Sequence, residues 1–231
     1  MNGAAVVGVV AAAVGLAVAL VVVVVVVART SRPGPRLTAA EAAAAGWRWQ
    51  GEGLDVLTRC GVVGVDVTEA GAVLTRDLGG RTVVAARTSG RSWTVRRGSV
   101  TMTSRVSGAP YALCSVRLPA ALPTIHLLRE GAGGGLATAV GVPDVDTESG
   151  AFNEGRRVVS DDDRVAHAVL APHVIAEVSA GPADATLQVV GDRLLSFRPG
   201  EPDLAELAAR AAWLVRVADA IPGFVYDERR D

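Results

Sequence analysis

The sequence predicts an α+β protein in which an N-terminal single transmembrane helix is followed by an antiparallel sheet packed by C-terminal helices. Three observations support this prediction. A long uncharged apolar run opens the chain, β-rich runs with Gly or Pro between them fill its middle, and helical patterns dominate its last third. Consecutive strands joined by short turns favour antiparallel pairing, because parallel strands need a long crossover connection.

Residues 1–28 form the predicted transmembrane segment. Within it, residues 4–28 carry no charge, and a helix of that length exceeds the ~30 Å hydrocarbon core of a bilayer. The alternative is a cleaved signal peptide, for which Val26 and Ala28 could be cleavage-site residues. Met1–Gly3 lack a basic side chain and the apolar run is longer than such peptides carry, so we expect an uncleaved anchor.

A linker over residues 29–37 connects the anchor to a single α+β soluble domain over residues 38–231. Arg29, Arg32 and Arg36 follow the apolar run, whereas no basic residue precedes it. Basic flanks of a transmembrane helix stay on the cytoplasmic side. We therefore expect a single-pass plasma-membrane protein whose soluble domain lies in the cytoplasm.

The soluble domain is expected to open with a helix over residues 38–45. Thr38 and Glu41 have the spacing of a capping box, and Gly46 suits the C-terminal cap. Residues 47–49 alternate bulky and charged side chains, as a half-buried strand does. An antiparallel meander is then predicted from five β-rich runs, at residues 71–77, 81–88, 99–106, 111–118 and 124–129.

A strand over residues 156–160 and a helical pattern over residues 161–178 come next. Pro172 lies inside the helical pattern and must kink or split it, since proline has no backbone N–H to donate. The run that follows predicts a hairpin whose turn is Gly191-Asp192.

The last predicted helix begins after Pro202 and stops at Pro222-Gly223. One apolar stripe runs along it, and this stripe should pack on the sheet. The stripe consists of Leu204, Leu207, Ala211, Leu214 and Val217.

The charge composition excludes several functions. The chain has a net charge of −1 and no lysine, so it lacks Schiff-base, Walker A and kinase-type lysines. Trp93 is the single aromatic residue between Arg81 and Arg105, which argues against base stacking and nucleic-acid binding. No nucleic-acid partner is expected.

Charge is unevenly distributed along the chain. Eight arginines and no acid lie between Leu78 and Arg129, whereas acids outnumber arginines eighteen to nine from Glu130 onward. A solvated sheet face that offsets the acidic helices is the ordinary explanation. If the arginines have a ligand, we expect anionic lipid headgroups beside the anchor. The residues assigned to that contact are Arg91, Arg96 and Arg97.

No catalytic, cofactor-binding or metal-ligating residue is assigned. The chain has no zinc-protease or hydrolase-elbow motif, and Leu136 stands where a dinucleotide-binding loop needs its third glycine. His167 and His173 are six residues apart rather than at the i, i+4 spacing of a zinc pair. Cys60 and Cys114 form no C-x-x-C motif, and we expect both to be buried apolar residues.

The C-terminal half, "AFNEGRRVVSDDDRVAHAVLAPHVIAEV" with "LQVVGDRLLSF" and "ADAIPGFVYDE", resembles a family of uncharacterised membrane-anchored proteins of actinobacteria. Gly46-Trp47 and the "VLTRDLGG" hairpin belong to the same pattern, and the resemblance covers most of residues 40–228. It implies an N-terminal transmembrane helix and an α+β domain. It carries no known activity, and the shared pattern is structural rather than catalytic.

The sequence therefore predicts a membrane-anchored, non-enzymatic binding or scaffold protein without a cofactor. Its expected partner is the lipid bilayer, through residues 4–28, together with an unidentified protein. The alternative is a membrane-tethered hydrolase or transferase whose site is assembled from dispersed side chains. The candidate residues for such a site are Asp161, Asp163, His167 and His173.

Overall fold

The fold was obtained as a computed structural model that describes residues 37–97, 100–129, 145–201 and 203–227, without the side chains of residues 66 and 91–109. The predicted transmembrane segment and linker residues 29–36 lie outside the described residues. Leu37–Asp231 forms one compact unit. Among the described residues, no helix is both long and apolar enough to cross a membrane.

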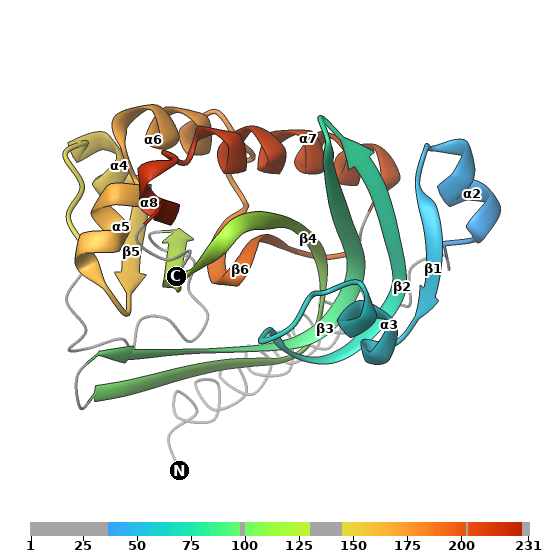
Figure 1. The fold of residues 1–231 in the computed structure, drawn as a ribbon. Helices are drawn as coiled ribbons and strands as arrows, with labels where there is room; N and C mark the ends of the chain where they lie inside the picture. The colour runs from blue at the N-terminus through green and yellow to red at the C-terminus, as the bar shows by residue number, and fades with distance from the viewer. Residues whose placement is uncertain (1–36, 98–99, 130–144, 202, 228–231) are drawn as a thin grey trace, which may run out of the picture. The chain divides into compact units, whose positions relative to one another are not determined.

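A six-stranded antiparallel sheet organises this unit (Figure 1). The strand order is β1-β2-β3-β4-β5, and β6 also pairs with β4. The predicted antiparallel sheet is confirmed. The strands are β1 (Arg48–Glu52), β2 (Asp66–Leu78), β3 (Arg81–Arg97), β4 (Val100–Arg129), β5 (Arg156–Ser160) and β6 (Thr186–Pro199).

The meander has fewer and longer strands than the sequence predicts. The three runs expected at 99–106, 111–118 and 124–129 belong to one strand, β4, of 30 residues. Its pairing register with β6 shifts between Arg117 and Leu122 and again between Leu122 and Ile125. Pro119 and Pro123 lie in these irregular stretches, so the prolines mark bulges in a continuous strand rather than its ends.

The hairpin predicted at Gly191-Asp192 is wrong. Gly191 and Asp192 lie in the middle of β6, which pairs with β4 from Tyr111–Pro199 to Leu127–Leu187. Gly191 has a φ of 55° and lies where the register shifts, so its positive φ accommodates a bulge in the pair instead of reversing the chain.

The helices follow the sequence more closely. The capping box of Thr38 and Glu41 is present, and Asp162 accepts a hydrogen bond from the Val165 N–H at 3.1 Å as an N-cap. Pro172 splits the predicted helix in two and occupies the first turn of the second half. The helices are α2 (Ala39–Ala44), α3 (Leu54–Arg59), α4 (Gly150–Gly155), α5 (Asp163–Val169), α6 (Pro172–Ser179), α7 (Leu204–Ala220) and α8 (Phe224–Asp227).

The two faces of the sheet carry separate hydrophobic cores. Val83 and Ala85 belong to the larger core, which includes Leu214 of α7, because alternate residues of a strand point to opposite faces. Val84 packs in a smaller core with Val56 of α3. Figure 1 shows α7 lying along the sheet and the short α3 beside its curved strands. The predicted packing of the last helix on the sheet is confirmed.

Candidate functional site

The dispersed Asp and His candidates lie on and around α5 and α6. Asp162 caps α5, and Nε2 of His173 donates a hydrogen bond to the carbonyl oxygen of Ala220 at 2.7 Å. The cavity described below is lined by other residues, and Asp161, Asp163, His167 and His173 take no part in it. Over the described ranges, no three or more His, Cys, Asp or Glu side chains gather as a metal-ion site.

The predicted lipid-contact residues Arg91, Arg96 and Arg97 lie in β3. Arg91 pairs with Val67 of β2 and Val106 of β4, whereas Arg96 and Arg97 pair with Thr101 and Val100 of β4. Their side chains lie outside the described part of the structure. Lipid contact by this patch therefore stays a prediction.

Other arginines of the basic stretch are paired with acids from the C-terminal half. Arg87 binds Glu201 through two hydrogen bonds, of 2.7 and 2.9 Å, and the hydrogen bonding to Glu201 raises the pKa of Arg87. Arg81 binds Asp219 at 2.6 Å, at the end of α7. Arg81 and Arg87 therefore offset acids of the same domain, as the explanation without a ligand predicts.

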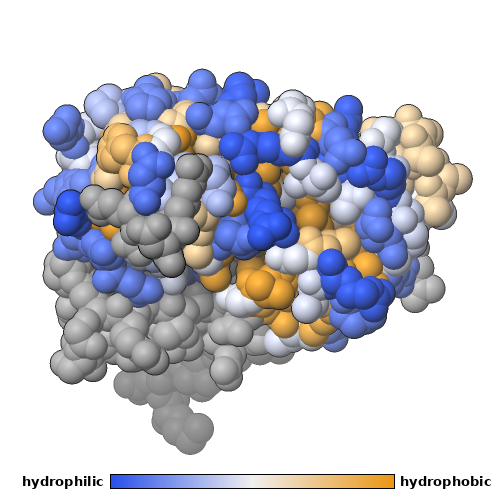
Figure 2. All heavy atoms as spheres, viewed as in Figure 1, coloured by the Kyte–Doolittle hydropathy of each residue, from blue (hydrophilic) through white to orange (hydrophobic). Residues whose placement is uncertain are grey.

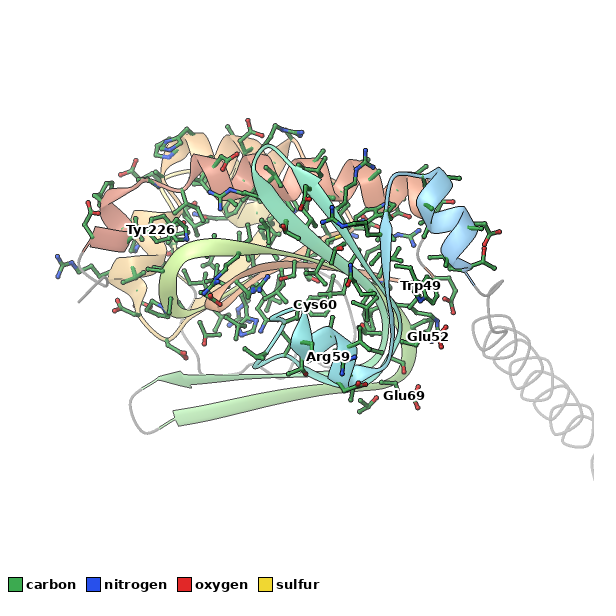
Figure 3. All side chains as sticks on the ribbon, turned by 45° about the vertical axis from the view of Figure 1, so that its right-hand side comes forward. Trp49, Glu52, Arg59, Cys60, Glu69 and Tyr226 are labelled. Atoms are coloured by element: carbon green, nitrogen blue, oxygen red, sulfur yellow. The ribbon has the colours of Figure 1, made fainter. Side chains whose placement is uncertain are left out.

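A cavity of about 420 Å³ opens where the end of α3 meets β3, β4 and β6. Its lining combines a cysteine, a threonine and three arginines with apolar residues that include Val84 and Leu118. Cys60, which is labelled in Figure 3, is the C-terminal cap of α3. The polar lining residues are Cys60, Arg81, Thr82, Arg117 and Arg193.

Arg193 is the buried cation of this cavity. Its side chain is only 9% exposed, and its Nη2 donates a hydrogen bond to the carbonyl oxygen of Cys60 at 3.2 Å. Its Nε lies 3.8 Å from Asp192, and this buried atom has no hydrogen-bond partner among the described residues. Burial lowers the pKa of Arg193, and the charge of Arg117 lowers that pKa further.

Arg117 lies at the mouth of the cavity. Its side chain is 73% exposed, and its Nε binds Asp192 at 2.6 Å. Its backbone oxygen accepts a hydrogen bond from Nη1 of Arg81 at 2.8 Å. The cavity thus combines one buried guanidinium with one exposed guanidinium.

The two cysteines occupy different environments. Cys114 is fully buried, and burial raises the pKa of its thiol to about 12. Cys60 is half-buried at the cavity, and burial raises its pKa too. The prediction of a buried apolar cysteine is confirmed for Cys114, whereas Cys60 borders the cavity.

Sequence reasoning missed this site. Its arginines come from β4 and β6, and pairing between these strands brings Arg117 and Arg193 together across 75 intervening residues. No local motif encodes such a juxtaposition. The predicted hairpin at Gly191-Asp192 would also have placed Arg193 opposite a neighbour in its own segment.

The comparison with solved structures found the crystal structure of the mycobacterial trehalose monomycolate transport factor A, TtfA. The match covers 80% of this chain and 90% of TtfA, with a TM-score of 0.53 and 13% sequence identity. Neither the comparison with protein families nor that with curated proteins returned a match. At this identity the likeness shows a shared fold, and its mycobacterial source agrees with the actinobacterial resemblance of the sequence.

Proposed function

We propose that this chain is a membrane-associated, non-enzymatic accessory protein of lipid transport. The fold likeness to TtfA carries the proposal, because it extends over most of both chains and TtfA is a trehalose monomycolate transport factor. The cargo that we propose is accordingly a glycolipid of that type.

The placement of the candidate catalytic residues supports a non-enzymatic role. An enzyme site needs acid, base or nucleophile side chains that converge on one pocket. Here His173 donates a hydrogen bond to the carbonyl oxygen of Ala220 at the end of α7, and the residues that line the cavity include none of Asp161, Asp163, His167 and His173. This arrangement favours a binding or scaffold protein over the alternative of a hydrolase or transferase.

The membrane attachment belongs to the same proposal. Residues 4–28 would cross the bilayer, and the domain would lie on the cytoplasmic side of the plasma membrane. The linker of residues 29–37 would hold the domain within about 30 Å of the surface even when fully extended. At that distance Arg91, Arg96 and Arg97 could contact anionic headgroups. The contact must be close, because physiological salt screens the attraction between charges beyond about 8 Å.

The proposal is tested in the organism that encodes the chain. The gene is deleted, newly made glycolipid is pulse-labelled, and the fraction that reaches the outer face is measured with a membrane-impermeant reagent. We expect that fraction to fall in the deletion strain and to recover with the wild-type gene. A chain without residues 4–28 should fail to restore it.

A second set of strains separates the accessory role from enzymatic activity. Asp161→Asn, Asp163→Asn, His167→Gln and His173→Gln variants should each restore transport, because the proposed role uses none of these side chains. Loss of transport in a variant that still accumulates and folds would favour the enzyme alternative. Unchanged glycolipid transport in the deletion strain would contradict the proposed function.

A further inference from the structure

We infer that the cavity between α3 and the sheet binds a phosphate-type oxyanion through Arg117 and Arg193. This inference is independent of the proposed function, since it rests on the charges and packing of the cavity alone. The shared chemistry could come from a phosphorylated lipid headgroup or from a free phosphate compound, and the experiment below distinguishes the two.

The register of the sheet places two arginines opposite each other. Arg117 and Arg193 are direct partners in the antiparallel β4–β6 pair. Like charges placed directly opposite each other destabilise a sheet. The alternation of side chains puts both residues on the face of Leu113 and Leu195, which belong to the core beneath α3. The repulsion therefore faces the cavity, where an anion bound between the two guanidinium groups would relieve it.

The described charges around the cavity do not balance. Asp192 is the carboxylate shared by Arg117 and Arg193, and Asp219 is bound to Arg81. Three arginines thus face two aspartates. Asp77, which accepts a hydrogen bond from the lining residue Thr82, is itself paired with Arg48 at 2.8 Å and adds no net charge. One positive charge remains at the cavity.

Arg193 has hydrogen-bonding capacity beyond its described partner. A guanidinium has five N–H donors, and a buried charge is costly unless it is paired and hydrogen-bonded. The one hydrogen bond described for Arg193 goes to the Cys60 carbonyl, and its buried Nε has no such partner among the described residues. A cation buried in this way has donors to offer a ligand.

The chain also makes room for this guanidinium. Gly61 has a φ of 80°, and a Cβ atom built on it would clash with Nη2 of Arg193. The turn after α3 therefore leaves space for the guanidinium group of Arg193, which a side chain at position 61 would occupy. A phosphate group matches the chemistry, because guanidinium groups bind its oxygens through paired, charge-assisted hydrogen bonds. The volume of about 420 Å³ lies within the usual range of small-molecule pockets.

Binding is measured by calorimetry on the full-length chain in a neutral detergent at constant ionic strength. The probes are inorganic phosphate, glycerol 3-phosphate as the polar part of a lipid headgroup, and glycerol as the neutral control. We expect both phosphates to bind and glycerol not to bind. Tighter binding of glycerol 3-phosphate assigns the site to headgroup-like compounds, and equal binding assigns it to free phosphate.

The variant R117Q should weaken phosphate binding at least about tenfold, because it removes one of the two cations. Its side chain is 73% exposed, so the fold should tolerate the change. R216Q is the matched control, since Arg216 of α7 is 54% exposed and pairs with Glu177 of α6 at 3.3 Å. R193Q should weaken binding further, and it is interpreted only if its unfolding midpoint stays near that of the wild type.

Cys60 provides a second readout. Because Cys60 is a lining residue of the cavity, bound phosphate should slow its alkylation by a maleimide, whereas glycerol should not. Absence of phosphate binding to the wild-type chain at about 10 mM, which would mean a binding free energy weaker than roughly −3 kcal/mol, would overturn the inference. Equal weakening by R117Q and R216Q would overturn it as well.

Discussion

Among the side chains that the structure describes, Arg210 on α7 is the most buried charge. Its side chain is 1% exposed and binds Glu206 at 3.0 Å, Asp184 at 3.2 Å and the Ser196 hydroxyl at 3.2 Å. Arg198 of β6 binds the same two carboxylates, at 2.9 and 3.1 Å. These residues form a network that joins α7 to β6 and includes Asp184, which lies just before β6.

Replacement of Arg210 by Met should lower the free energy of unfolding by about 2 kcal/mol. Removing one partner of a buried ion pair usually costs ~3–5 kcal/mol, and the cost is smaller here because Asp184 and Glu206 are partly exposed. Arg216→Met is the control and should cost under about 0.5 kcal/mol, since its ion pair is exposed. Equal losses in urea unfolding would contradict this assignment.

Asp184 should make stability depend on pH. Burial tends to raise its pKa, but the hydrogen bonds and charges of Arg210 and Arg198 together lower the pKa below its usual value. A lowered folded-state pKa contributes stability above the unfolded value of about 3.9, and this contribution is lost as pH falls through the folded value. The stability difference between wild type and Asp184→Asn should therefore shrink between pH 7 and about pH 3. A constant difference in urea unfolding would contradict this role.

At the scale of elements, the contact between α6 and α7 depends on a glycine. A Cβ atom built on Gly181, which follows α6, would clash with the indole of Trp213. That indole donates a hydrogen bond to the Glu177 carbonyl at 2.9 Å, so it cannot move without losing a partner. The two helices are thus held together by a close approach of backbone to ring.

Gly181→Ala should lower the free energy of unfolding by about 1–3 kcal/mol, the usual cost of overpacking. Gly155→Ala is the matched control, because a Cβ atom there meets nothing within 4 Å. We expect that change to be neutral or slightly stabilising. The measurement is thermal or urea unfolding with Trp fluorescence, and equal effects of the two changes would show that the close approach is unimportant.

Helices were more predictable than strands because their ends are marked locally. Thr38 and Glu41 mark the start of α2 within four residues, and Pro172 alone divides α5 from α6. Strand length depends on partners far away in the sequence. Pro119 and Gly191 are turn residues by type, yet β4 and β6 pass through them because each irregular stretch faces the other across the pair. The cavity lies at that irregularity, so no local pattern in the sequence predicts it either.

At the scale of the whole molecule, the fold class and the antiparallel pairing could be predicted, because they follow from the alternation of apolar residues and from short turns. The arginine cavity could not, since it requires the register of β4 against β6. The membrane attachment is a separate matter and remains a prediction from residues 1–36. It leads to a direct test.

A fluorescent protein fused after Asp231 should be active in the cytoplasm, and an exported phosphatase fused at the same place should be inactive. The reason is the arginine cluster after the apolar run, which should keep the following domain on the cytoplasmic side. Replacing Arg29, Arg32 and Arg36 by Gln is the matched change and should weaken this preference. An active phosphatase with a dark fluorescent protein would reverse the topology.

The long strand β4 has a consequence for the exchange of its amide hydrogens with solvent. Between Tyr111 and Val116 it has β3 on one edge and β6 on the other, whereas from Val100 to Val106 the described pairing is with β3 alone. Amides that bond a neighbouring strand exchange slowly, and those on an open edge exchange quickly. Deuterium uptake should therefore alternate fast and slow along residues 100–106 and be uniformly slow along residues 111–116. Exchange along one continuous strand would thus show, residue by residue, where the described pairing of β4 with β6 ends.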